Sequence, residues 1–272
     1  MKISLIYAYW PNQPQGTTWC DLPWALRDKG LPKKLHAAGH EVLETVLMAE
    51  EPFAEELPAG LKLAGAVAEA VREAEAEGEL PVVVAGSCAV AAIGVVAGLG
   101  AGTSIAWFDA HADLNTPETS ESGLLEGMAL AAASGHAWRA IVAREAGLTD
   151  PVRLEDTVLF GVRDIDPAEA EIIAGCGLAT TSQPAELARL MAERERVYIH
   201  LDIDVHDARG LATSQFAVHG GPSPEAVREA LVGLTNVKAI ALTGLDPAAP
   251  DAARAEEIAI EHVLAIAGAQ RV

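Results

Sequence analysis

Three side chains that can bind a metal ion follow one apolar run of this 272-residue sequence at every second position. Residues 103–108 are rich in β-forming types, and Asp109, His111 and Asp113 come directly after them. Extended backbone points alternate side chains in the same direction. We therefore expect these three groups to converge on one point at the end of a strand.

A second apolar run, residues 197–204, repeats the arrangement with Asp202 and Asp204. Neighbouring strands of this kind would gather four carboxylates and one imidazole. Carboxylates at close range raise one another's pKa values unless cations lie between them, so the cluster predicts a site for one or two divalent metals. Oxygen and imidazole ligands suit manganese, iron or zinc. Any one of these residues could instead cap a helix or support the core, but five at this spacing favour a metal site.

The order of the predicted elements is typical of an α/β protein. Strands are predicted at residues 2–9, 41–48, 80–86, 103–108, 156–162, 197–204 and 237–242. Helices are predicted at residues 22–38, 58–78, 89–97, 127–135, 184–195, 223–234 and 252–268, and one more begins at Pro167. A polar turn is expected at residues 12–18. This alternation predicts a three-layer α/β/α sandwich with a mostly parallel central sheet, a single domain over residues 1–272, with its site at the carboxyl ends of the strands.

Four glycines between residues 94 and 102 could suggest a dinucleotide-binding loop. They end a predicted helix and precede a strand, whereas that loop follows a strand and opens a helix. We interpret them as a helix stop and a turn.

Composition argues against several classes of function. The chain has 39 acidic and 19 basic residues, a net charge of −20 with no basic cluster, so neither nucleic acid nor an anionic membrane surface is an expected partner. The sequence has no signal-peptide pattern and no apolar stretch long enough to span a membrane, and we expect a cytoplasmic protein. Cys20, Cys88 and Cys176 have no paired spacing and predict no disulfide framework.

The order of the motifs resembles the arginase/agmatinase family of ureohydrolases. The resemblance rests on residues 109–113 (Asp-Ala-His-Ala-Asp), 115–117 (Asn-Thr-Pro), 122–123 (Ser-Gly) and 200–204 (His-Leu-Asp-Ile-Asp), and it covers nearly the whole chain in order. In that family two manganese ions activate a water molecule that attacks a guanidinium carbon. The resemblance also implies a homo-oligomer, either a trimer or a hexamer.

Carried over by position, the resemblance assigns a role to each metal-capable residue. Asp109 and Asp202 would bridge both metals, and His111 and Asp204 would complete one metal site. Asp113 would complete the other site and handle the proton of the attacking water. Metal-activated water is what such a reaction needs, because a guanidinium carbon is a poor electrophile at neutral pH.

The resemblance also implies a small-molecule amino-acid substrate. Asn115, Ser120 and Ser122 stand where arginases hold the α-carboxylate of the substrate, and Asp166 stands where they hold the α-amine. Each could instead be an ordinary loop-capping residue. Together they favour an α-amino acid over a decarboxylated amine.

Three positions depart from the family pattern, and all three concern chemistry. Cys88 replaces a metal-binding histidine, which makes zinc or iron possible beside manganese. Glu126 replaces a histidine that shuttles protons, and Gly244 replaces a glutamate that holds the guanidinium. Loss of that carboxylate costs roughly 1.5–3 kcal/mol per charge-assisted bond, so plain arginine is a doubtful substrate.

The expected function is hydrolysis of a C–N bond in a modified arginine such as Nω-hydroxy-L-arginine. Family members that act on hydroxyarginine in natural-product pathways also have a cysteine at the first ligand position. Two alternatives remain: a catalytically impaired paralogue that binds metal and amino acid, and a hydrolase of a different amidine or amide. Restoring histidine at Cys88 and glutamate at Gly244 is expected to move preference back toward arginine.

Overall fold

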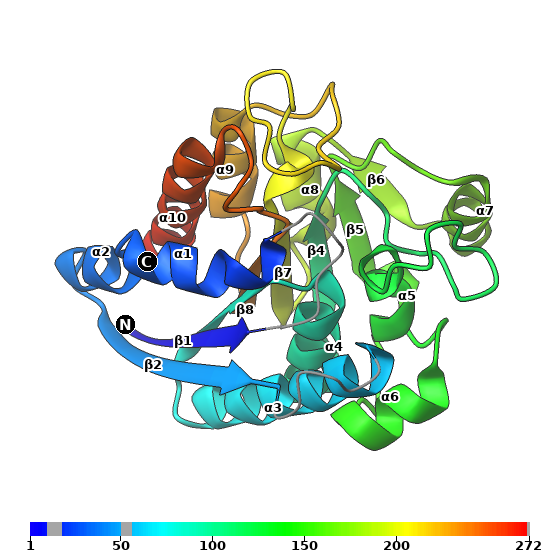
Figure 1. Ribbon diagram of the computed structural model, residues 1–272, viewed down its shortest axis with the longest axis horizontal. Helices are drawn as coiled ribbons and strands as arrows, with labels where there is room; N and C mark the ends of the chain where they lie inside the picture. The colour runs from blue at the N-terminus through cyan, green and yellow to red at the C-terminus, as the bar shows by residue number, and fades with distance from the viewer. Residues whose placement is uncertain (10–17, 50–55, 271–272) are drawn as a thin grey trace.

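A computed structural model describes residues 1–9, 18–49 and 56–270. The turn predicted at residues 12–18 lies, apart from Thr18, outside the described residues. Eight parallel strands form one sheet in the order β2-β1-β3-β8-β7-β4-β5-β6 (Figure 1). The strands are β1 (Lys2–Tyr9), β2 (Glu41–Met48), β3 (Leu80–Ala85), β4 (Ser104–Phe108), β5 (Thr157–Phe160), β6 (Ala179–Thr181), β7 (Val197–Asp202) and β8 (Val237–Thr243).

Helices cover both faces of this sheet, which confirms the predicted three-layer α/β/α architecture (Figure 1). One core lies under α3 (Glu56–Ala76), α4 (Cys88–Leu99), α5 (Ala129–Ala133) and α6 (Arg139–Ala146). The other core lies under α1 (Leu22–Asp28), α2 (Leu31–Ala37), α8 (Pro184–Met191), α9 (Pro224–Val232) and α10 (Ala252–Ala269). The remaining helix is α7 (Pro167–Cys176), which follows β5. Within the described part of the chain, no helix combines the length and apolar character that crossing a membrane requires.

The middle of the sheet positions the site. Every residue of β3, β4 and β7 is buried, as expected of apolar strands covered on both faces. In the order β3-β8-β7-β4, the carboxyl ends of four neighbouring strands meet at one edge. The chain leaves these ends at residues 85, 243, 202 and 108, so Cys88, Gly244, Asp202 and Asp109 are delivered to one region.

Several local predictions were wrong, and glycine accounts for two of them. The helix predicted at residues 22–38 is split by Gly30, which has a φ of 91° and separates α1 from α2. Gly94 and Gly98 are not part of a helix stop but lie inside α4, where a Cβ on either would come within 2.7 Å of Val67 or Val71 of α3. The short strand β6 and the helix α6 were not predicted.

Candidate active site

A cavity of about 270 Å³ opens at this edge of the sheet. Nearly all of the predicted site residues line it: Cys88, Asp109, His111, Asp113, Asn115, Ser122, Glu126, Asp166, Asp202, Asp204 and Gly244. Ser120 is not in the lining; its hydroxyl accepts from the Gly123 N–H at 3.0 Å, and the Ser122 hydroxyl accepts from the Leu124 N–H at 3.2 Å. In this structure both serines therefore hold the turn, while their contact with a substrate remains a prediction.

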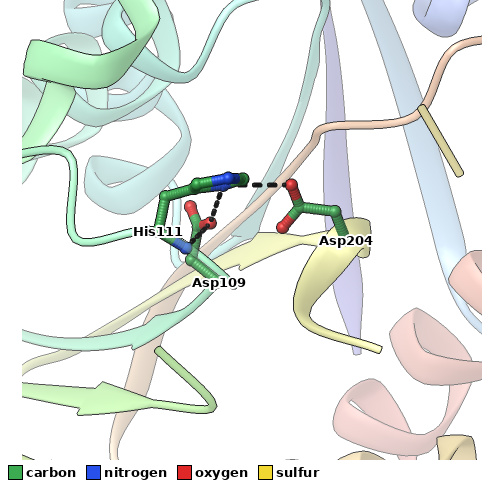
Figure 2. Close-up of side chains that lie close together, drawn as sticks. All are labelled: Asp109, His111 and Asp204. Atoms are coloured by element: carbon green, nitrogen blue, oxygen red, sulfur yellow. Dashed lines mark hydrogen bonds and ion pairs between the residues drawn. The ribbon is translucent and has the colours of Figure 1, made fainter. Parts of the chain in front are cut away.

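Asp109, His111 and Asp204 form the tightest part of the site (Figure 2). His111 Nδ1 lies 3.3 Å from Asp109 Oδ1 and 3.2 Å from Asp204 Oδ2. One ligand atom from each residue falls within 4.8 Å of the others, close enough to share one ion. Asp164 Oδ2 lies 3.8 Å from the outer ring nitrogen of His111, in the place of a carboxylate that orients a metal-binding imidazole.

Backbone donors fix three carboxylates of the site. Asp109 Oδ1 accepts from the His111 N–H at 2.8 Å, and Asp204 Oδ1 accepts from the Ala110 N–H at 3.1 Å. Asp202 Oδ1 accepts in turn from the Asp204 N–H at 2.8 Å. The carboxylates are therefore oriented by the chain itself before any ligand enters.

These residues do not converge by simple strand alternation. Strand β4 ends at Phe108, and Asp113 has a φ of 50°, in the left-handed region. Strand β7 ends at Asp202, so Asp204 lies in a 3₁₀ turn, η4 (Ile203–Val205), rather than on the predicted strand. Tight turns after the strands, rather than extended backbone, bring the carboxylates together.

The electrostatics of the cluster favour a cation. Burial, and then the neighbouring carboxylate of Asp204, raise the pKa of Asp109 to about 7. Burial and the charge of Asp109 also raise the pKa of Asp113, and burial and Asp204 raise that of Asp202. Burial lowers the pKa of His111, but the carboxylates of Asp109 and Asp204 outweigh this effect. Together they raise the pKa of His111 to about 12. A cation at this point would relieve the repulsion among the carboxylates.

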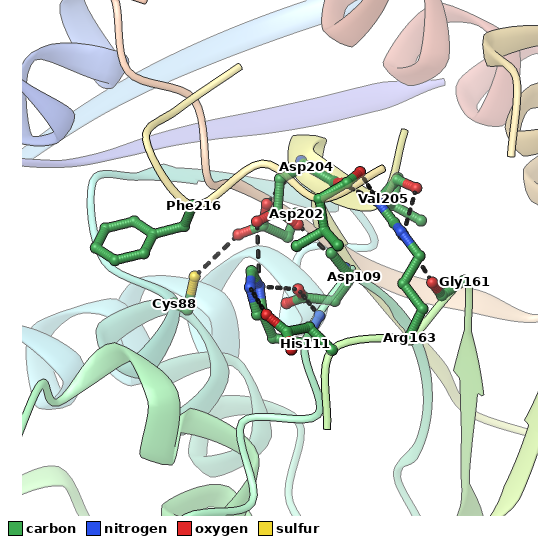
Figure 3. A network of polar contacts seen from close by, with 12 residues as sticks. Cys88, Asp109, His111, Gly161, Arg163, Asp202, Asp204, Val205 and Phe216 are labelled. Carbon is green, nitrogen blue, oxygen red and sulfur yellow. Dashed lines mark hydrogen bonds and ion pairs between the residues drawn. The ribbon is translucent and has the colours of Figure 1, made fainter. Parts of the chain in front are cut away.

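Cys88 and Asp202 meet on the other side of the cavity (Figure 3). Cys88 is the first residue of α4, and its thiol donates to Asp202 Oδ2 at 3.2 Å. Burial, and then the charge of Asp202, raise the pKa of this thiol, which would have to lose its proton to bind a metal. A divalent metal fits the donor set: Asp109, His111 and Asp204 would hold one ion, and Cys88, Asp113 and Asp202 offer donors for a second.

Gly244 lies beside the same carboxylate. Its φ is 69°, and a Cβ built on it would overlap the carboxylate of Asp202. A glutamate at residue 244 therefore has no room unless Asp202 moves. This contact revises the expectation that Gly244→Glu would simply restore a guanidinium anchor.

Arg163 was missed by the sequence analysis. Its guanidinium donates to backbone carbonyls on the turns around Asp204 (Figure 3), namely those of Gly161, Asp204, Val205, His206, Val218 and His219. This one side chain joins the segment after β5 to the long loop after β7 and holds the backbone that carries Asp204. All of its partners except Gly161 are distant in sequence, so no local pattern identifies it.

Asn115 and Asp166, both predicted to contact the substrate, contact each other. Asn115 Nδ2 donates to Asp166 Oδ2 at 2.8 Å. Beneath them, the buried carboxylate of Glu169 accepts from the backbone N–H groups of Leu114 and Asp166, both at 2.9 Å. Glu169 was also missed, although an acid three residues after Asp166 at a helix start is a known capping signal.

Glu126 reaches the amino end of α4. Its Oε2 accepts from Ser87 Oγ at 3.0 Å and from the Ala89 N–H at 3.2 Å. Burial raises its pKa to about 7, against the effect of these hydrogen bonds. Glu126 therefore carries a carboxyl group that could exchange a proton near neutral pH, next to the helix that begins with Cys88.

Glu126→Gln should reduce the pH dependence of stability. The raised pKa means that folded Glu126 holds its proton more tightly than the unfolded chain does, so stability falls as pH rises from about 4.5 to about 7. Glutamine keeps an oxygen for Ser87 and Ala89 but carries no charge. Between about pH 5 and pH 8, we expect the free energy of unfolding of the wild type to fall by on the order of 1–3 kcal/mol relative to that of the variant. Urea unfolding at each pH measures this difference. Parallel pH profiles for the two proteins would contradict the raised pKa.

Comparison with known proteins identifies the family. The chain belongs to the arginase family, whose model matches residues 45–267. An N(omega)-hydroxy-L-arginine amidinohydrolase of Streptomyces lavendulae is 30% identical over 235 residues, 84% of this chain and 83% of that protein. An arginase of Bacillus caldovelox is 31% identical over 202 residues, 68% of this chain and 63% of that protein. The chain is therefore an arginase-family hydrolase.

Solved structures agree with the fold. The crystal structure of arginase from Bacillus subtilis matches with a TM-score of 0.88 at 23% identity, and the match covers 100% of both chains. Arginase from Bacillus cereus matches with a TM-score of 0.87 at 24% identity, covering 98% of this chain and 99% of that one. The arginase-like α/β fold predicted from the sequence is thus confirmed.

Proposed function

We propose that this protein hydrolyses a C–N bond of a guanidine-type α-amino acid, with Nω-hydroxy-L-arginine preferred over arginine. The observation that supports this most strongly is the contact of Cys88 and Gly244 with one carboxylate, Asp202. Cys88 offers no imidazole and Gly244 offers no carboxylate, whereas the family resemblance places these two groups at the two positions. The similarity to a hydroxyarginine amidinohydrolase across 84% of the chain points the same way.

The roles of the polar residues follow from their positions. Asp109, His111, Asp202 and Asp204 hold divalent metal, for which manganese is the proposed ion, and Cys88 and Asp113 complete the donor set. When bound, the metal lowers the pKa of water so that it can attack a guanidine carbon at neutral pH. Asp113, whose carboxylate lines the cavity, is the residue proposed to accept the released proton.

The absence of a side chain at Gly244 selects for a less basic substrate. An arginine guanidinium needs an anionic partner to offset its desolvation, and no carboxylate extends from residue 244. A hydroxyguanidine is less basic and depends less on such an ion pair. Its planar group can enter the space bordered by Gly244, Cys88 and Phe216, all of which line the cavity.

Turnover of a substrate panel tests the proposal. Nω-hydroxy-L-arginine, arginine and agmatine are supplied to the manganese-loaded protein, and urea-type and amine products are quantified. We expect the highest kcat/KM on hydroxyarginine, by at least about tenfold, which corresponds to the loss of one charge-assisted hydrogen bond on arginine. Equal or better turnover of arginine would contradict the proposed selectivity.

Asp166→Ala should weaken recognition of the α-amine. Asp166 faces the cavity and accepts from Asn115, so a substrate ammonium placed there gains a charge-assisted bond. We expect KM to rise roughly 10- to 100-fold for an α-amino acid substrate, from a loss of about 1.5–3 kcal/mol.

The matched comparison for this variant is a substrate without the α-amine. The deamino analogue 5-guanidinopentanoate and its hydroxylated form lack that group but keep the carboxylate, and their KM should change much less. Asn115→Ala provides a second test, because it removes the partner of Asp166 without removing charge. Equal effects of Asp166→Ala on both substrate types would exclude the amino-acid clamp.

A metal-binding and amino-acid-binding paralogue without turnover is the second candidate function. The protonated thiol of Cys88 supports it, because a thiol held by Asp202 leaves one metal position poor in donors. This candidate requires that hydroxyarginine bind in calorimetry while no product forms with any substrate of the panel. Product formation excludes it.

A further inference from the structure

A line of buried polar groups runs through β7 and β8 to the carboxylate of Asp202. Tyr198 Oη lies 2.7 Å from His200 Nδ1, and His200 Nε2 lies 3.4 Å from Thr243 Oγ1. Thr243 Oγ1 donates to Asp202 Oδ2 at 3.3 Å, the oxygen that also accepts from the thiol of Cys88. Tyr198, His200 and Thr243 are fully buried.

The protons on this line can be assigned by counting donors. Thr243 has one hydroxyl proton. It donates this proton in a hydrogen bond to Asp202, because an ionised carboxylate can only accept. The threonine oxygen then accepts from His200, so the proton of the imidazole lies on Nε2. His200 Nδ1 is left as an acceptor, which is satisfied by the hydroxyl of Tyr198. Tyr198 only donates, His200 and Thr243 each donate once and accept once, and every donor on the line points toward Asp202.

Packing holds the imidazole of His200 in place and keeps it neutral. Trp107 of β4 stacks on the ring with 3.7 Å between centroids and 4° between planes, and Tyr198 meets it edge-on. No charged side chain is in direct contact with the ring among the hydrogen bonds and ion pairs of the described residues. A buried imidazolium without a hydrogen-bonded carboxylate partner is costly, so the ring is assigned as neutral from its contacts.

We propose that Tyr198, His200 and Thr243 are positioning residues that set the orientation of the Asp202 carboxylate for metal binding. The hydroxyl of Thr243 fixes Oδ2 of Asp202, and the Asp204 N–H fixes Oδ1 at 2.8 Å. The inference rests on the metal-ligand role of Asp202 in the proposed function. Groups that orient metal ligands in this way typically account for about 10- to 100-fold in metal affinity.

Thr243→Val tests the line without a change of shape. Valine keeps the branched side chain but cannot donate to Asp202 or accept from His200. Thr243→Ser restores the hydroxyl and serves as the rescue variant. Thr157→Val is the control, because Thr157 is also a buried strand threonine and its hydroxyl has no hydrogen-bond partner among the described residues.

The measured quantity is the dissociation constant of Mn²⁺ by calorimetry on metal-free protein, together with the melting temperature of each metal-free variant. We expect Thr243→Val to weaken Mn²⁺ binding about 10- to 100-fold, with Thr243→Ser and Thr157→Val within about threefold of wild type. Wild-type affinity in Thr243→Val would overturn the positioning role. If wild-type protein bound no metal, the proposed function would fail first, and with it the ligand role of Asp202.

Nitrogen-15 NMR of the protein loaded with diamagnetic Zn²⁺, which keeps Asp202 ionised, provides a readout independent of metal affinity. We expect the spectrum of His200 to show the neutral ring with its proton on Nε2. Tyr198→Phe removes the donor to Nδ1 and should populate the other tautomer. A proton on Nδ1, or an imidazolium, in the wild-type protein at neutral pH would overturn the assigned direction of the line even if Thr243→Val weakened metal binding.

Discussion

Asp109→Ala and Asp202→Ala should each leave the protein essentially without bound metal. Asp109 contacts His111, and its charge raises the pKa of Asp113; Asp202 contacts Cys88 and the Asp204 backbone, so each acts on both groups of donors. Loss of groups that only orient a ligand costs about 10- to 100-fold in metal affinity, and loss of a direct ligand should exceed that range. We expect metal content after dialysis to fall below about a tenth of wild type, with turnover lost in parallel.

Two further variants set the scale of this effect. Asp164→Ala removes only the carboxylate 3.8 Å from the outer nitrogen of His111, so a loss of about tenfold in affinity is expected. Asp156→Ala removes a carboxylate that binds Arg194 far along the chain, and it should leave metal content unchanged. Full metal occupancy in Asp109→Ala or Asp202→Ala, measured by mass spectrometry, would show that the metal site is assigned to the wrong residues.

The layered fold was predictable because its signals are local and strong. Residues 80–86 and 103–108 are continuous apolar runs, and such runs become buried central strands. Long helices such as α3 and α10 carry repeated apolar spacing and were placed to within a few residues. The three-residue strand β6 offers too short a pattern, and the break at Gly30 depends on a backbone conformation that composition alone does not specify.

Which residues line the cavity was largely predictable from the sequence, but their geometry was not. The acids at the ends of β4 and β7 could be identified because parallel strands bring their carboxyl ends to one edge. The left-handed backbone of Asp113 and the turn that carries Asp204 depend on distant contacts. The clearest case is Arg163, whose carbonyl partners extend to His219. Hydrogen bonds of a side chain to distant backbone have no sequence pattern, so only the structure could identify them.

The overlap at Gly244 is another feature that only coordinates could show, and it changes how selectivity can be engineered. Gly244 has a left-handed φ of 69°, and the carboxylate of Asp202 occupies the space of its missing side chain. Any side chain there must displace Asp202 from Cys88 and Thr243. Gly244→Glu, even combined with Cys88→His, should therefore lose metal affinity before it gains a guanidinium anchor.

Gly244→Ala isolates this effect with a single methyl group. The left-handed backbone alone should cost about 1–2 kcal/mol of stability, and the displaced carboxylate should weaken metal binding at least tenfold, as expected for a misoriented ligand. Gly177→Ala is the matched control, since Gly177 has a left-handed backbone with a φ of 63° and, among the described residues, nothing lies within 4 Å of a built Cβ. Both variants should lose a similar amount of stability in urea unfolding of the metal-free protein, or slightly more at Gly244. Only Gly244→Ala should lose Mn²⁺ affinity in calorimetry, so equal metal affinities in the two variants would mean that Asp202 moves aside without cost.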